Sequence, residues 1–221
     1  MEWKQVFTEG DNTVSVETPE GYKIFQYTYT PNGRTVYNEG IENVTGNIDA
    51  DFVGISGKKP YGNGIYSNHI DGITSISGDF IGNKADYMAH NGFIDNISDI
   101  QNIKGDFISN VVYGHYYAKG VGITNNGNID NIEGDFIGNM SIVDKTLYPS
   151  YANIGYDTFG GAIYNSNTIT NIAGNFIGNL IYYNTFSSTY GGGYLSSYGG
   201  AIANDYGNIE TITGDAIGNY I

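Results

Sequence analysis

Acidic residues recur in this sequence at one position, directly before an aromatic residue. If the copies stack, neighbouring carboxylates repel by about 1 kcal/mol in water. Each must therefore be hydrated at a corner, accept backbone N–H groups, or bind a cation such as calcium. A repeated residue marks structure, whereas catalysis needs a unique site, so we favour a structural corner over calcium binding and over catalysis. The acidic residues are Asp51, Asp79, Asp106, Asp135 and Asp215, with Asn175 in the same position once.

The other chemically reactive residue types form no recognisable site. His69, His90 and His115 do not share a repeat position and have no ligand-like spacing. The absence of cysteine excludes disulfides and thiolate metal sites. No nucleophile elbow, zinc-protease motif or P-loop occurs. We therefore expect no enzyme activity, no catalytic residues, no metal and no cofactor. One alternative is a carbohydrate-active lyase or glycosidase, which would need a unique pair of carboxylates. The other is a purely structural stalk.

Tyrosine is unevenly distributed, and this points to binding. Segments 84–90, 111–121, 140–160 and 180–199 hold twelve of the 21 tyrosines, mixed with Ser, Gly and Asn. This composition is typical of adaptable binding loops, because Tyr offers a large contact area at low entropy cost. The alternative, which stays open, is that these rings pack on the outer wall. The candidate ligand-binding residues are Tyr113, Tyr116, Tyr117, Tyr148, Tyr151, Tyr156, Tyr182, Tyr183, Tyr190, Tyr194 and Tyr198.

The net charge narrows the class of partner. The chain has 221 residues and a formal charge of −14. Such an acidic surface repels phosphate backbones and anionic lipid, so we expect no nucleic-acid partner.

A short phrase of the type G-D-F-I-G-N recurs and defines the fold. Its copies centre on Phe52, Phe80, Phe107, Phe136, Phe176 and Ala216. The spacings are 28, 27, 29, 40 and 40 residues, which indicates a repeat array. The shorter copies are too short for a propeller blade, and leucine is too scarce for a leucine-rich repeat.

Each repeat has one segment of nearly constant length and one of variable length. A second phrase, complete as G-G-A-I at 160–163 and 199–202, precedes each closing Asn, with 16 to 18 residues from its Ile to that Asn. From the Asn to the next such Ile, the distance varies from 11 to 24 residues. The constant segment predicts three short strands with two corners, and the variable segment predicts a surface loop. Stacked coils of this kind form an all-β parallel β-helix.

The alignment of the copies predicts the buried columns. One column contains the Phe residues, and the closing Asn residues form a ladder in which stacked amides bond along the axis. A further column contains Ile48, Ile76, Ile103, Ile132, Ile172 and Ile212.

The chain divides into two predicted parts. Residues 1–40 contain two alternating strand patterns around P-E-G, which predict a β-hairpin that caps the first coil. Residues 41–221 form the β-helix of about six repeats. The chain stops directly after the sixth phrase, so we expect a fragment of a longer array.

The alternation of two motifs resembles a known family. G-G-A-I alternates with F-x-x-N at 80–83, 107–110, 136–139 and 176–179. This pattern is similar to the passenger domains of polymorphic outer membrane proteins and related autotransporters. The resemblance implies a right-handed β-helix displayed on the bacterial cell surface or secreted, acting as an adhesin. The partner would be a host-cell or matrix protein, a glycan or a second copy, and the family's outer-membrane β-barrel is missing from this chain.

Overall fold

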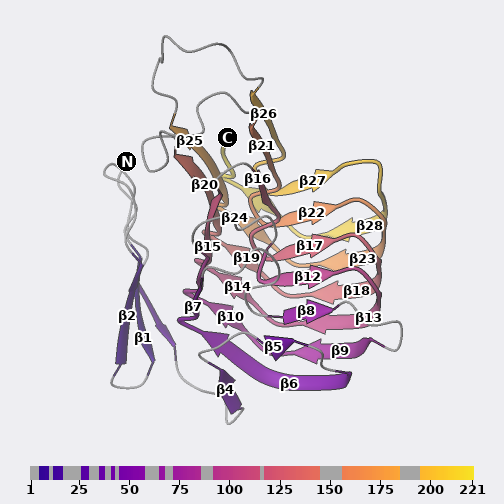
Figure 1. Cartoon of the computed structure of the whole chain (residues 1–221), viewed down its shortest axis with the longest axis horizontal. Helices are drawn as coiled ribbons and strands as arrows, with labels where there is room; N and C mark the ends of the chain where they lie inside the picture. The colour runs from indigo at the N-terminus through magenta and orange to yellow at the C-terminus, as the bar shows by residue number, and fades with distance from the viewer. Residues whose placement is uncertain are drawn as a thin grey trace.

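The computed structural model shows a parallel β-helix, drawn in Figure 1 as coils that climb from β6 to β27. It describes residues 5–9, 12–16, 26–29, 35–37, 41–42, 45–57, 65–67, 72–85, 92–114, 117–144, 156–184 and 195–221. Side-chain surroundings are described for 45–55, 65, 72–85, 92–114, 118–143, 158–182 and 197–221. Over these described ranges, no helix is long and apolar enough to cross a membrane.

The constant segment forms three parallel faces, as expected. Face 1 contains β5 (Ile41–Glu42), β8 (Ile65–Ser67), β12 (Ile94–Asn96), β17 (Ile123–Asn125), β22 (Ile163–Asn165) and β27 (Ile202–Asn204). Face 2 contains the first half of β6 (Gly46–Val53), then β9 (Ile73–Ser77), β13 (Asp99–Lys104), β18 (Asn128–Glu133), β23 (Thr168–Ala173) and β28 (Asn208–Thr213). Face 3 contains β4 (Thr35–Tyr37), the second half of β6, β10 (Phe80–Ile81), β14 (Phe107–Ile108), β19 (Phe136–Ile137), β24 (Phe176–Ile177) and β29 (Ala216–Ile217).

The variable segment also contributes strands, so the expectation that it is only a loop is wrong. Face 4 contains β7 (Ser56–Gly57), β11 (Lys84–Ala85), β15 (Val111–Gly114), β20 (Met140–Asp144) and β25 (Leu180–Asn184). Face 5 contains β16 (Tyr117–Lys119), β21 (Tyr156–Phe159) and β26 (Leu195–Tyr198). In the variable segments that carry β16, β21 and β26, the length variation is therefore confined to the chain between faces 4 and 5, because the strands at both of its ends stack in register.

The predicted columns form the interior and are confirmed. Consecutive rings from Phe52 to Phe176 stack with centroids 4.7–4.9 Å apart and planes within 6° of parallel. The Ile48-to-Ile212 column is in register on every pair of face 2 strands. Ile212 is 51% exposed because β28 is the last strand of face 2 in this chain. Burial of these apolar columns is the main favourable contribution to folding.

The corner between faces 2 and 3 requires glycine because successive coils approach closely there. A Cβ at Gly134 would lie 2.0 Å from the carbonyl oxygen of Gly105, and Gly105 meets Gly78 in the same way. The first copy has Ala50 at this position, and there the strand is not interrupted: β6 continues from face 2 into face 3. The one copy without glycine at this corner is thus also the copy in which a single strand, β6, spans both faces.

The N-terminal strands pair differently from the predicted hairpin. The two expected strand patterns are β2 (Asn12–Val16) and β3 (Gln26–Tyr29), but both pair with β1 (Gln5–Glu9), which lies between them. β1 pairs antiparallel with β2, from Gln5 opposite Val16 to Glu9 opposite Asn12, and pairs in parallel with β3. β4 already joins face 3 before residue 41, and the capping role stays a prediction.

Candidate binding surface

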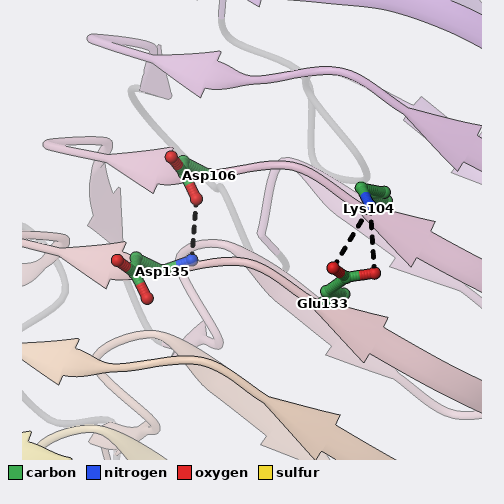
Figure 2. A network of polar contacts seen from close by, with 4 residues as sticks. All are labelled: Lys104, Asp106, Glu133 and Asp135. Carbon is green, nitrogen blue, oxygen red and sulfur yellow. Dashed lines mark hydrogen bonds and ion pairs between the residues drawn. The ribbon is translucent and has the colours of Figure 1, made fainter. Parts of the chain in front are cut away.

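The Asp column is part of the backbone scaffold. The Oδ1 atom of each acidic residue accepts the backbone N–H of its equivalent in the next coil, at 2.8–2.9 Å from Asp51 to Asn175. Figure 2 shows this bond from Asp135 to Asp106, beside the exposed Lys104–Glu133 ion pair. The sequence allowed hydration at a corner, bonding to backbone N–H groups or cation binding for these carboxylates. The structure shows bonding to backbone N–H groups. No group of three His, Cys, Asp or Glu side chains that could hold a metal occurs among the described residues.

The closing Asn ladder is confirmed and runs along the corner between faces 3 and 4. Nδ2 of Asn110 donates to Oδ1 of Asn139 at 2.9 Å and to the carbonyl of Phe80 at 2.8 Å. Its Oδ1 accepts the backbone N–H and Nδ2 of Asn83. Both amide hydrogens and the oxygen are thus bonded while the side chain is fully buried. A buried amide without these bonds would cost roughly 1–3 kcal/mol, so the ladder fixes the register of the coils.

A second Asn ladder lies at the corner between faces 1 and 2 and was missed. Its three amide–amide bonds are each 2.8 Å long. The signal in the sequence was the recurring I-x-N, whose Asn follows the face 1 isoleucine by two residues. The ladder consists of Asn96, Asn125, Asn165 and Asn204.

The predicted binding tyrosines fall into different surroundings. Tyr113 is only 8% exposed and pairs along face 4 with Ile142, which in turn pairs with the half-buried Tyr182. This is the packing arrangement that the sequence left open. Tyr198, on face 5, is 56% exposed. Tyr117, Tyr156 and Tyr183 lie on described strands, but their side-chain surroundings are outside the described part. Tyr116, Tyr148, Tyr151, Tyr190 and Tyr194 lie outside the described residues altogether.

An aromatic cluster lies where face 5 meets face 1. The rings of Phe159 and Tyr198 stack at 5.4 Å with planes 11° apart. Tyr164, on face 1, packs against Phe159 at 5.4 Å with the rings tilted by 55°. The ammonium of Lys119 lies 4.5 Å from the centroid of Tyr164 and 5.8 Å from that of Phe159. A cation over ring faces is attractive, so Lys119 supports this cluster from the preceding coil.

The next corner brings a carboxylate to the cluster. The hydroxyl of Tyr164 donates to Oδ2 of Asp205 at 3.1 Å. Burial, and then the hydrogen bond and negative charge of Asp205, raise the pKa of Tyr164 to about 12. The phenol therefore stays protonated to a higher pH than an ordinary tyrosine, and in this form it donates to Asp205. Tyr206 follows, fully exposed and with φ of 60°.

Four of these residues, Phe159, Tyr198, Asp205 and Tyr206, border a groove of about 510 Å³ on the last coil of this chain. We call it the Tyr198 groove, and its lining includes Phe159, Tyr198, Ala203, Asn204, Asp205 and Tyr206. Of the predicted tyrosines that the structure describes, only Tyr198 lines it. The sequence did not point to the other residues that line the groove, because they lie in or beside the constant segment, which was interpreted as purely structural. The sequence did contain a signal that the last coil has one extra residue. Its constant segment has 17 residues from its Ile to its Asn, whereas the three before it have 16.

The fold and its ladders define the class of this protein as a parallel β-helix with stacked Asn and Phe columns. A scan against family models, a search of the curated proteins and a search of the solved structures each gave no match.

Proposed function

We propose that this chain is a non-enzymatic binding module displayed on the bacterial cell surface or secreted. In this proposal it is the passenger of an autotransporter that resembles the polymorphic outer membrane proteins and acts as an adhesin. Its partner would be a host-cell or matrix protein, a glycan or a second copy, with no role for nucleic acid. The alternation of G-G-A-I with F-x-x-N supports the family, and the parallel β-helix agrees with the fold that the resemblance implies.

The observation that carries the proposal is the shared origin of the two Tyr-rich insertions. Residues 145–155 and 185–194 each follow a face 4 strand and precede a face 5 strand. Asp144 pairs with Asn184 where the insertions begin, and Tyr156 pairs with Leu195 where they end. Both insertions therefore leave and rejoin the β-helix one coil apart, on the same side. An ordered scaffold that carries variable Tyr-rich segments is the usual arrangement of a binding surface.

Two further observations support binding over hydrolysis. The Asp column, which was the most regular group of carboxylates, is bonded to backbone N–H groups within the scaffold. The described lining of the Tyr198 groove holds one carboxylate, whereas glycosidases use two that flank the scissile bond.

The test replaces residues 145–155 and 185–194 by short Gly-Ser turns and measures folding and binding to host cells, matrix proteins and a glycan array. We expect the trimmed β-helix to fold, because the strands at both ends remain paired, and to lose binding. A matched variant keeps both lengths and changes only Tyr148, Tyr151, Tyr190 and Tyr194 to Ser. Binding equal to the parent's by a folded, trimmed chain would sink the proposal for these insertions. Concentration-dependent sedimentation of the parent tests self-association.

A further inference from the structure

We propose that the N-terminal sheet, formed by β1, β2 and β3, docks on an apolar stripe along the outer side of faces 3 and 4. The proposal concerns an interaction surface within the chain and does not depend on the proposed binding function. It differs from the end cap expected from the sequence, because the docked sheet would lie beside several coils and not below the first.

The β-helix has a second apolar cluster outside its interior. On face 3, Phe80 and Phe107 belong to the interior, while the residues that follow them, Ile81 and Ile108, belong to the second cluster. Because successive residues of a strand point to opposite sides of the sheet, this cluster lies on the outer side. Face 4 shows the same alternation. We call the cluster the outer stripe, and it consists of Val53, Ile81, Ile108, Val111, Tyr113, Met140 and Ile142.

The outer stripe is covered by a further part of the chain. Its residues are exposed by 0% at Val111 and by at most 8%, at Tyr113. On the outer side of face 2, by contrast, Gln101 and Asn131 are exposed. A position on the outer side of the β-helix therefore does not bury a residue by itself. Burial of the outer stripe requires another layer packed on faces 3 and 4.

The burial of the outer stripe is graded along face 3. Val53, Ile81 and Ile108, in the first three coils, are only 1%, 1% and 3% exposed. Ile137 and Ile177, in the next two coils, are half-buried. Since β29 still follows the strand of Ile177, this gradient lies within the array. The cover is therefore most complete near the N-terminal end of the β-helix.

The N-terminal sheet has an apolar row that needs such a partner. The register of β1 with β2 and β3 places Phe7, Val14 and Tyr27 in one row across the three strands. Neighbouring rows fall on opposite sides of a sheet, so one side is more apolar than the other. An apolar side of a sheet is stable only when it packs on another layer. The neighbouring row consists of Thr8, Thr13 and Thr28.

A short connection keeps the N-terminal sheet close to the outer stripe. β3 ends at Tyr29 and β4 begins at Thr35, so five residues join the sheet to face 3. They span at most about 20 Å, which corresponds to about four coils of the β-helix. Tyr37 of β4 pairs with Phe52, directly before the first residue of the outer stripe. Figure 1 draws β1 and β2 on the side of the β-helix that carries β7 and β15 of face 4.

The other candidate covers fit the gradient less well. The insertions at 145–155 and 185–194 begin after Asp144 and Asn184, in later coils, so they would cover those coils best. An end cap below the first coil would lie beside Val53 but would not reach Ile108, two coils above it. The N-terminal sheet, tethered at the first coil, agrees with burial that is greatest in the first three coils.

The experiment measures amide hydrogen exchange of the whole chain by mass spectrometry. Ile108→Lys places a charge on the outer stripe, so exchange in β1, β2 and β3 should accelerate about tenfold or more as the sheet detaches. Exchange in the face 2 strands should stay unchanged. Gln101→Lys is the matched control, because it introduces the same charge in the same coil on the exposed outer side of face 2. We expect it to leave the exchange of the sheet at the wild-type rate.

A reciprocal pair of variants probes the sheet itself. Phe7→Lys alters the apolar row and should uncover the outer stripe. Binding of anilinonaphthalene sulfonate, a dye that reports exposed apolar surface, should then rise severalfold. Thr8→Lys, in the neighbouring row, is the control and should leave dye binding unchanged. This pair also decides the case in which Ile108→Lys disrupts the whole fold.

Every outcome supports or overturns the docking. Faster exchange of the sheet in Ile108→Lys, with wild-type rates in Gln101→Lys, supports it. Wild-type exchange of the sheet in a folded Ile108→Lys chain overturns it, and so does acceleration confined to the two insertions. Equal dye binding by Phe7→Lys and Thr8→Lys overturns it too. No ligand enters these measurements, so their failure leaves the proposed binding module standing, and loss of the binding module leaves the docking standing.

Discussion

Two regions of the β-helix differ in how residue types repeat from coil to coil: the buried columns of the constant segment and the Tyr198 groove. On faces 2 and 3, the same residue type occupies each buried column coil after coil, as in Phe107 and Phe136. Around the groove, the residue changes at every step: Lys119, Phe159 and Tyr198 on face 5, and Thr124, Tyr164 and Ala203 on face 1.

The difference shows how this fold separates stability from recognition. Identical neighbours satisfy one another: flat rings stack on rings, and each amide both donates and accepts along its ladder. In the buried Phe and Asn columns, equal members therefore cover one another and pair their amides, which leaves little for a ligand to contact. Where the members differ in size or charge, the stack leaves a notch and unused acceptors, and these are what a ligand needs.

The largest expected effect comes from breaking the regular region. Phe136→Ala should lower the free energy of unfolding by about 3–5 kcal/mol, because Phe136 is fully buried between Phe107 and Phe176. Tyr206→Ala, in the irregular region, should change it by less than about 0.5 kcal/mol. Urea denaturation of both variants measures the contrast. Equal unfolding midpoints would mean that the two regions do not differ in their contribution to stability.

An effect of intermediate size is expected in the pH dependence of folding stability, through Tyr164. The pKa of Tyr164 is raised from 10.0 to about 12 in the folded chain, so folding favours the protonated phenol. Its contribution to stability is complete below pH 10 and is lost as the pH rises from 10 through about 12. At 1.36 kcal/mol per pKa unit, the loss is at most roughly 2–3 kcal/mol.

Tyr164→Phe isolates this effect from the titration of the other tyrosines. The variant keeps the ring but has no proton to lose, so the stability gap between parent and variant should shrink from pH 10 to 12. Thermal melts at half-unit pH steps give this gap. A gap that stays constant across this range would contradict the assignment to Tyr164.

The smallest expected effect concerns an irregularity inside the regular region. Ser109 has φ of 57°, where Gly82, Gly138 and Gly178 have φ of 61° in their own copies. It is buried, and its Oγ has no hydrogen-bond partner among the described residues. Ser109→Gly removes the backbone strain and the buried hydroxyl but frees the unfolded chain, so we expect a gain of up to about 1 kcal/mol.

The reverse substitution supplies the control for this last change. Gly138→Ser places a serine at a position with φ of 61°, as Ser109 is in the preceding coil. It should therefore lower stability by about 1 kcal/mol. Differential scanning calorimetry resolves both changes. If both substitutions shift the melting temperature in the same direction, the conformation at this corner does not determine the difference.

Much of the fold was predictable from the sequence because its determinants repeat. The fixed distance from the face 1 isoleucine to the closing Asn predicted faces 1 to 3, and the alignment of Phe136 with Phe107 predicted the ring column. Faces 4 and 5 were not predicted, because their strands lie within segments whose lengths differ from copy to copy. A strand such as β21 becomes recognisable only from its pairing with β16 and β26.

The candidate site was less predictable than the scaffold. Tyr composition identified Tyr198 but gave no reason to prefer it to Tyr113, which the structure buries. Lys119, Tyr164 and Asp205 are 41 or 45 residues from the neighbours to which they bond. Such contacts depend on which coil lies above which, and no local pattern encodes them.

The sequence by itself determined the repeat, its length, the identity of the inward columns and the closing Asn ladder. These features depend on equal residues at equal intervals, which stack whatever the details of the coil. Only the tertiary structure decided that the Asp column bonds to backbone N–H groups and that a notch opens beside Tyr198. The physical reason is that both depend on the distance and direction between unlike groups in neighbouring coils, and stacking in three dimensions sets those quantities.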